Sequence, residues 1–355
     1  MTEETSLKPR GPSQGKRPTA YDVARLAGVS QSMVSRAFTP GTSISPVARA
    51  KVVEAARALN YRPNLIARSL ITQRSRLIGV GMAYMENQFY PTILEALSEG
   101  FAAEGYRVLL FTPGPDGDPD PILDEVLRFQ VAAIILASAR MTSHFAEECA
   151  QARVPVVLFN RRTENPAVSS ITGQNRVGGR TIGSFLAAGG HARFAFVAGL
   201  EDSSTSRERE QGFREALAEA GAGLAQRVVG QYDFAAAREA ARTLFARQDR
   251  PDAVFCANDH TAFAVMQTAR AEFGLEVGRD VSIVGFDDVG LAAWPAFDLT
   301  TFSQPVRPMA RRVVEVTLGR IEGGDDDPVH DTVPGELVVR MSARRPRQDW
   351  RPPQP

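Results

Sequence analysis

The chain has 355 residues, which is long for one domain, and 43% of them are hydrophobic, which is ample for buried cores. This composition excludes a disordered or fibrous protein. The net charge is zero, but residues 1–76 hold 13 Lys and Arg against 4 Asp and Glu (+9), whereas the remainder holds 28 against 37 (−9). A basic first segment indicates a polyanionic partner, although a small domain can also be basic by chance.

Cysteine usage and hydropathy indicate where the protein works. Cys149 and Cys256 lie far apart, a pattern that predicts neither a disulfide framework nor a metal site and that suits a reducing compartment. The first 17 residues lack the apolar stretch of a signal peptide, and no run approaches the roughly 18 apolar residues of a membrane span. We therefore expect a cytoplasmic protein that has no membrane partner.

The N-terminal segment predicts an arm and then a first helix. Residues 1–17 are polar and rich in glycine and proline, with almost nothing to bury, and we predict that they are disordered. Thr19 and Asp22 have the spacing of a capping box, in which each side chain bonds the backbone of the other. This spacing predicts a helix over residues 20–27.

Two further helices are predicted from their start signals. Ser30 is a capping residue and predicts a helix over residues 31–38. Ser45, followed by a proline at the first helical position, predicts a third helix that ends near residue 59. Residues 64–70 then form a short connecting segment that is also expected to be helical.

The spacing of the first two helices fits a helix-turn-helix. Gly28 permits the positive φ that a tight turn needs. We expect Leu26 on the buried face of the first helix and Val53, Ala56 and Leu59 on that of the third. The second helix then exposes the N-terminal half that a recognition helix presents to the major groove. An ordinary helical hairpin is the alternative interpretation.

Beyond residue 76, short apolar runs alternate with amphipathic ones, which is typical of parallel sheets covered by helices. The strands are predicted at residues 77–82, 108–112, 133–137, 156–160, 194–198, 253–256 and 281–285. Examples of the helices between them are residues 93–104, 178–188 and 208–220. So many elements exceed one sheet and predict two lobes. The proline-rich residues 346–355 are predicted to be a disordered tail.

Residues 19–80 resemble the lactose-repressor (LacI/GalR) family of bacterial transcription regulators. The matching blocks are YDVARLAGVSQSMVSRAF, Ile44 and Ser45, LNYRPN, ARSL and LIGV, in this order. The resemblance continues to about residue 345. It implies an all-α helix-turn-helix head and an α/β, two-lobed effector domain like a periplasmic binding protein, with two doubly wound parallel sheets. It also implies a homodimer that binds operator double-stranded DNA and a small-molecule effector, expected to be a carbohydrate, without a cofactor.

The resemblance assigns roles in DNA binding. Gln31 and Ser32 occupy the positions that select operator sequence, and Arg36 occupies a base-reading position; glutamine can pair with adenine and arginine with guanine. Leu70 occupies the position that inserts into the minor groove and kinks the duplex, with the small Ala67 one turn earlier. Without the family, Leu70 would be interpreted as a core leucine. The positions implied to contact the DNA backbone are Thr19, Tyr21, Ser30, Ser35, Ser45 and Asn64.

The resemblance also sets domain limits and effector contacts. The limits are a head at 18–62, a hinge helix and linker at 63–76, and an effector and dimerisation domain at 77–345. Its N-lobe is about 77–173 and 306–331 and its C-lobe about 174–304 and 334–345, with crossings near 172–174, 303–306 and 330–334.

The implied effector-binding residues are Phe89, Tyr90, Asn160, Ser203, Thr205, Arg209, Phe234, Asn258 and Asp287. Turn formation, core packing and surface exposure are the alternative roles for these residues.

Two other classes compete with a regulator. An enzyme is disfavoured because the chain lacks the glycine-rich phosphate and dinucleotide motifs and the nucleophile elbow. Its four histidines, at positions 144, 191, 260 and 330, have no metal spacing. A solute-binding protein of the periplasmic type is the second alternative; it would need a signal peptide and would not use a DNA-binding head.

Overall fold

The structure is a computed structural model, and it describes residues 17–39, 42–62, 75–112, 119–137, 141–163, 165–323, 327–346 and 350–353. The chain forms two compact units, Met1–Ser75 and Arg76–Pro355, which we call the head and the body. The predictions for residues 1–16 and for Asn64, Ala67 and Leu70 lie outside the described residues. No helix in the described ranges is long and apolar enough to cross a membrane.

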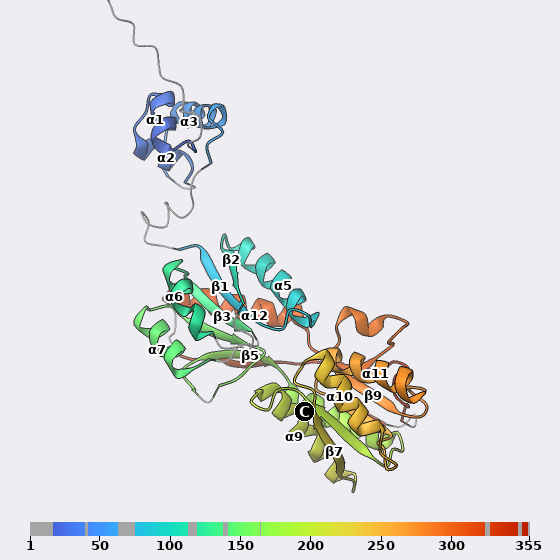
Figure 1. Ribbon diagram of the computed structural model, residues 1–355. Helices are drawn as coiled ribbons and strands as arrows, with labels where there is room; N and C mark the ends of the chain where they lie inside the picture. The colour runs from blue at the N-terminus through green and yellow to red at the C-terminus, as the bar shows by residue number, and fades with distance from the viewer. Residues whose placement is uncertain are drawn as a thin grey trace, which may run out of the picture. The chain divides into compact units, whose positions relative to one another are not determined.

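The head consists of three helices in its described part, α1 (Ala20–Ala27), α2 (Gln31–Ala37) and α3 (Pro46–Ala58) (Figure 1). The predicted start signals are confirmed. Thr19 and Asp22 form the capping box of α1, and Ser30 and Ser45 accept backbone N–H groups at the starts of α2 and α3. Gly28 ends α1 with a φ of 67°, as the turn requires.

The core of the head is small and made of valine and alanine. Its buried residues are Val23, Ala24, Val34, Ala37, Val52, Ala55 and Ala56. The prediction for Leu26 is wrong, because this side chain is 55% exposed. At 100° per residue, Leu26 lies about 110° from the centre of the face that Val23, Ala24 and Ala27 share. The buried face of α3 consists of Val52, Ala55 and Ala56, so the predicted Val53 and Leu59 are only partly buried.

The body contains two six-stranded sheets. The first has the order β11-β5-β4-β3-β1-β2 and all its neighbouring strands are parallel. Its strands are β1 (Leu77–Met82), β2 (Arg107–Phe111), β3 (Ala133–Ala137), β4 (Val156–Phe159), β5 (Ser169–Gly173) and β11 (His330–Val333). The helices packed on it are α5 (Phe89–Ala103), α6 (Asp120–Arg128), α7 (Ser143–Gln151) and α12 (Val306–Ile321).

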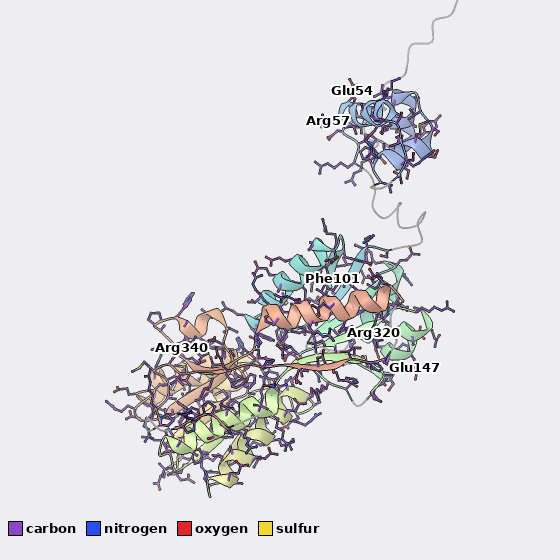
Figure 2. The ribbon with its side chains drawn as sticks, turned by 180° about the vertical axis from the view of Figure 1, so that it is seen from behind. Glu54, Arg57, Phe101, Glu147, Arg320 and Arg340 are labelled. Carbon is purple, nitrogen blue, oxygen red and sulfur yellow. The ribbon has the colours of Figure 1, made fainter. Side chains whose placement is uncertain are left out.

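Alternate residues of these strands face two different layers of helices. Ile78 and Val80 of β1 and Ile135 of β3 pack with α5 and α12, whereas Ile134 and Leu136 of β3 pack with α6 and α7. Figure 2 labels the buried Phe101 of α5 where this helix lies beside α12. The period-two alternation in burial partner is what a sheet covered on both faces requires.

The second sheet has the order β12-β10-β9-β8-β6-β7, and only the short β12 is antiparallel to its neighbour. Its strands are β6 (Phe194–Ala198), β7 (Leu224–Val229), β8 (Ala253–Cys256), β9 (Ser282–Asp287), β10 (Thr300–Ser303) and β12 (Leu337–Val338). The helices α8 (Asn175–Ala188) and α9 (Ser204–Glu219) share one hydrophobic cluster with it, and α10 (Phe234–Phe245) and α11 (Asp259–Phe273) share another. A 3-10 helix, Gly290–Ala293, follows β9.

The chain passes between the two sheets three times. The first two passages follow Gly173 and Ser303, the last residues of β5 and β10. The third lies after Val333, because β11 pairs with β5 and β12 pairs with β10. The first sheet therefore extends two residues beyond the limit of 331 that we predicted for the N-lobe. The seven predicted strands exist. The prediction omitted β5 and β10, which are rich in serine and threonine, and β7, β11 and β12, which are only partly buried.

The prediction of a disordered tail is wrong for Trp350. Its ring lies 5.4 Å from the ring of Phe185, and its Nε1–H donates to the Ser184 hydroxyl at 3.1 Å. Proline content governs the local backbone, whereas a tryptophan ring can bury enough apolar surface to pack on a distant helix.

Candidate functional site

The N-terminal half of α2 presents polar side chains outward. Gln31, Ser32, Ser35 and Arg36 are exposed, whereas Val34 is buried in the core of the head. This division follows from the helical period, because the buried Val34 and Ala37 are three residues apart. The geometry matches that of a recognition helix, whose N-terminal residues reach base edges in the major groove.

Local hydrogen bonds orient part of this surface. The Ser30 hydroxyl accepts the Met33 N–H at 3.3 Å and lies 2.9 Å from the Ser32 hydroxyl. The guanidinium of Arg36 lies 3.5 Å from both the carbonyl and the hydroxyl oxygen of Ser32. The Arg49 guanidinium donates to the Ala37 carbonyl and ties α3 to the end of α2. The other described positions predicted to contact the DNA backbone are also exposed: Thr19, Tyr21 and Ser45.

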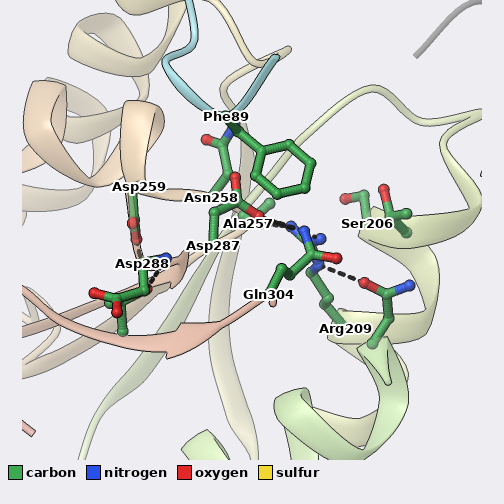
Figure 3. A network of polar contacts seen from close by, with 12 residues as sticks. Phe89, Ser206, Arg209, Ala257, Asn258, Asp259, Asp287, Asp288 and Gln304 are labelled. Carbon is green, nitrogen blue, oxygen red and sulfur yellow. Dashed lines mark hydrogen bonds and ion pairs between the residues drawn. The ribbon is translucent and has the colours of Figure 1, made fainter. Parts of the chain in front are cut away.

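In the body, a buried arginine organises a polar cluster at the carboxyl ends of β8 and β9 (Figure 3). Arg209 of α9 is 2% exposed, and it donates to the Asn175 side-chain oxygen and to the Ala257 carbonyl. Its Nη2 lies 3.6 Å from the carboxylate of Asp287. Its guanidinium carbon lies 3.7 Å from the centroid of the Phe286 ring, a cation–π contact.

The carboxylate of Asp287 has several partners. It accepts the side-chain N–H of Gln304 at 2.6 Å and a hydrogen bond from Asn87, which lies in the loop after β1. Burial raises the pKa of Asp287 to about 6, although the charge of Arg209 and these two hydrogen bonds act in the opposite direction. The cluster therefore draws on residues near both sheets.

A second buried carboxylate holds the turn that carries Asp287. Asp259 accepts the Val289 N–H at 2.9 Å and the Thr301 hydroxyl at 2.6 Å. Asp287 and Asp288 have φ values of 121° and 55°, which non-glycine residues rarely adopt. Burial and the charge of Asp287 raise the pKa of Asp259 well above its usual value. Asp259 thus fixes an unusual backbone beside the cluster.

Several buried polar atoms near the strand ends have no hydrogen-bond partner in the described structure. They include Nη2 of Arg209, Oε1 of Gln304 and Oδ1 of Asn160. Asn160 follows β4 with a φ of 54°, and Gln304 packs against Gly173 at the end of the neighbouring β5. Buried polar groups are usually paired, so these atoms form a set of one donor and two acceptors that a ligand could satisfy.

The structure brings some predicted effector contacts to this cluster and leaves others beside it. Arg209, Asp287 and Asn258 lie together (Figure 3), and Asn258 also caps α11 by accepting the Thr261 N–H at 2.9 Å. Phe89 is 2% exposed, packs edge-on against Tyr90 and is drawn beside the cluster. Phe234 packs instead against the ring of His260, at 5.8 Å between centroids. Ser203 and Thr205 lie at the start of α9 and contact Tyr232.

Sequence reasoning missed Asn175, Gln304 and Asp259. Gln304 follows directly after β10, and Asn175 begins α8 two residues after β5, where the chain passes between sheets. The sequence could have indicated these two residues, because both are polar and lie within or next to the predicted crossings. Asp259 follows Asn258 in the sequence, but its partners are Val289, after β9, and Thr301 of β10, and neither can be recognised from the sequence around Asp259. Among the described residues, no group of His, Cys, Asp and Glu could hold a metal ion.

Two family models match the chain. One, described as bacterial regulatory proteins, lacI family, matches residues 19–64, and the other, a periplasmic binding protein-like domain, matches residues 184–343. The HTH-type transcriptional regulator CelR of Thermobifida fusca is 32% identical over 337 residues, which are 92% of this chain and 98% of CelR. The ribose operon repressor of Escherichia coli (strain K12) is 31% identical, with coverage of 85% and 93%.

Solved structures agree with this relationship. The lac repressor dimer bound to operator and the anti-inducer ONPF is 27% identical, covers 92% of this chain and 99% of its own, and has a TM-score of 0.82. A complex of the transcriptional regulator CelR with cellobiose is 29% identical, with coverage of 92% and 100% and a TM-score of 0.70. The chain therefore belongs to the lacI family of bacterial regulatory proteins, and it is a DNA-binding transcription regulator and not an enzyme or a solute-binding protein.

Proposed function

We propose that this regulator is a repressor whose affinity for operator DNA is controlled by a carbohydrate bound at the polar cluster of the body. The observation that carries the proposal is the buried Arg209, close to Asp287 and Gln304. Its Nη2 pairs with the Asp287 carboxylate at 3.6 Å but makes no hydrogen bond in the described structure. A hydroxyl group both donates and accepts hydrogen bonds, so a polyol matches a site that offers one free donor and free acceptors. The CelR–cellobiose complex supports the same ligand class.

We further propose that two copies of the chain act together in the cytoplasm. A single head offers few base contacts, and paired half-sites give the specificity that a regulator needs. The body exposes large apolar side chains that a second copy could cover: Leu110 on the edge strand β2, Trp294 and Met341. The lac repressor structure is titled a dimer. Analytical ultracentrifugation at micromolar concentration tests this, and a monomer there contradicts it.

The hinge completes the proposed mechanism. A segment as short as residues 64–70 is not expected to be helical alone, so we propose that it folds when two hinges pair on DNA. The effector would bias that pairing by binding one arrangement of the body more tightly, with a coupling of about 1–3 kcal/mol. Replacement of Leu70 by alanine should then weaken specific operator binding at fixed salt, and unchanged affinity would contradict the proposal.

The effector site is tested with operator fragments selected from genomic DNA and a panel of sugars and sugar acids. A true ligand raises the melting temperature of the body and changes operator affinity. Asp287→Ala should abolish that response and keep operator binding without effector. The control is Asp249→Ala, whose exposed carboxylate pairs only with Arg247 in the described contacts. Equal responses in both variants would remove the site assignment; no preference for any genomic fragment would remove the operator proposal.

A further inference from the structure

Tyr232 lies on the turn between β7 and α10, beside two predicted effector contacts. Its hydroxyl is 3.3 Å from the Ser203 hydroxyl and 3.3 Å from that of Thr205, and these two are 2.8 Å apart. Ser203 and Thr205 are 4% and 6% exposed. The three side chains thus form a closed triangle of hydroxyl groups, which we call the hydroxyl triangle.

The hydroxyl triangle lies at the same edge of the sheet as the polar cluster. Thr205 comes one turn before Arg209 on α9, and residues four apart share a helix face. Tyr232 follows β7, as Asn258 follows β8 and Asp287 ends β9, and carboxyl ends of parallel strands in one sheet lie along one edge. The hydroxyl triangle therefore extends the candidate effector site beyond Arg209.

The fold holds Tyr232 in this position. Gln231 and Tyr232 have φ values of 55° and 58°, which non-glycine residues seldom adopt. The ring lies against Gly199, where a Cβ atom would overlap it. The next residue, Asp233, caps α10 by accepting the Ala236 N–H at 2.7 Å. A side chain placed by such a turn is restricted in where its hydroxyl can point.

The hydrogens of the hydroxyl triangle determine what it can offer a ligand. Three hydroxyls carry three hydrogens, and a closed ring of hydrogen bonds uses all three, which leaves acceptor lone pairs. Ser203 also accepts the Ser206 N–H at 3.5 Å. A ligand hydroxyl can therefore donate to the remaining lone pairs of Thr205 and Tyr232. A carboxylate only accepts, so it would have to break one bond of the ring to find a donor.

The nearby arginine cations do not remove this discrimination. Arg209 has the carboxylate of Asp287 at 3.6 Å, and Arg161, whose side chain is 11% exposed, has that of Asp202 at 3.3 Å. Their charges are therefore largely compensated within the protein. We propose that Tyr232 is a specificity-determining residue, and that the hydroxyl triangle it completes makes the site select a neutral polyol over a sugar acid. This inference rests on the proposed carbohydrate-binding function.

Matched neutral and acidic sugars test the assignment. The full chain and the variants Tyr232→Phe and Thr205→Val are titrated with D-glucose, D-glucuronate, D-galactose and D-galacturonate, and the melting of the body is followed. Each variant removes one hydroxyl of the triangle and leaves a hydrogen free for a carboxylate. We expect wild-type protein to prefer a neutral sugar, and the neutral-to-acid affinity ratio to fall about 3- to 10-fold in both variants, as for the loss of one hydrogen bond.

The control is Tyr106→Phe, which removes the same atom from a buried ring at the start of β2 and should leave the ratio unchanged. An unchanged ratio in both test variants, or a wild-type protein that binds the acids as tightly as the neutral sugars, would overturn the role of Tyr232. If no sugar stabilises the wild type, the carbohydrate proposal itself fails and this assignment falls with it. If Tyr232→Phe does not fold, Thr205→Val decides.

Discussion

The head and the body differ in how they build a functional surface. In the head, Gln31, Ser32, Ser35 and Arg36 lie within two turns of one helix, and all are exposed. In the body, Arg209, Asp287 and Gln304 come from α9, β9 and the segment after β10, and all are at least 95% buried. The side chains predicted to read DNA are thus separate from the core of the head, whereas the polar cluster is part of the core of the body.

This difference has energetic consequences. An exposed side chain on a helix can be changed with little effect on stability, because water solvates what remains. A buried charge that loses its partner cannot be solvated, and its removal affects folding as well as binding. Substitutions of the exposed side chains of α2 should therefore change only the affinity for operator DNA, whereas substitutions in the polar cluster should also change the stability of the body. Four predictions test this contrast.

Arg209→Met should have the largest effect, because it leaves the buried Asp287 without its cation. Breaking a buried ion pair costs about 3–5 kcal/mol. Burial raises the pKa of Asp287 to about 6, so this carboxyl can take up a proton as the pH falls, and the loss should be larger at pH 8 than at pH 5. Denaturant unfolding of the body at both pH values measures this loss in unfolding free energy. Arg176→Met, at an exposed pair with Glu215, should cost less than about 1 kcal/mol; equal losses would contradict the contrast.

Arg36→Ala should weaken operator binding without unfolding the head. Loss of a bidentate base contact costs about 1–3 kcal/mol, or roughly 5- to 150-fold in affinity. The stability of the head should change by less than about 0.5 kcal/mol, because the side chain is exposed. Binding to a selected operator and to random duplex at fixed salt measures the effect. Arg57→Ala removes the same charge from α3 and should lower both affinities by the same factor. Unfolding of the head in Arg36→Ala would contradict the separation between the exposed side chains of α2 and the core of the head.

Gly212→Ala should destabilise the body by pushing α9, which carries Arg209, away from α8. A Cβ at Gly212 would overlap the carbonyl oxygen of Arg176 on α8, and overpacking costs about 1–3 kcal/mol. Gly319→Ala is the matched control on α12, where a Cβ meets nothing within 4 Å. It should stabilise the body by about 0.5–1 kcal/mol, because alanine favours the helix. Calorimetric melting compares the two variants, and the same sign in both would contradict the close approach of α8 and α9.

His191→Asn should change how stability depends on pH. Burial and the charge of Arg344 lower the pKa of His191 from 6.5 to about 4, so its contribution is present above pH 6.5 and is lost as the pH falls toward 4. Asparagine keeps an acceptor for the Arg344 guanidinium, which lies 2.9 Å from Nδ1. The wild type should therefore lose up to about 1.4 kcal/mol per pH unit relative to the variant in this window. Parallel slopes in chemical denaturation would show that His191 is not kept neutral by the fold.

The sequence by itself determined the helix starts of the head, the family and the sheet-and-helix alternation of the body; the three body helices given as examples begin three or four residues before their predicted starts. Capping by Thr19, Ser30 and Ser45 acts over three residues, and burial in helices and strands repeats every 3.6 or 2 residues. These interactions are local, so they can be recognised before any fold is known. The exposed polar face of α2 was predictable for the same reason, because its residues share one short segment.

Only the tertiary structure decided which polar groups meet. Gln304 reaches Asp287 and Tyr232 reaches Ser203 because the strand order of the second sheet places their segments side by side. Asp259, after β8, reaches Thr301 of β10 across the intervening β9. The same holds for Trp350, which packs on α8 despite its proline-rich surroundings. A buried hydrogen bond depends on partners that are distant in the chain, and the sequence around either partner carries no record of the other.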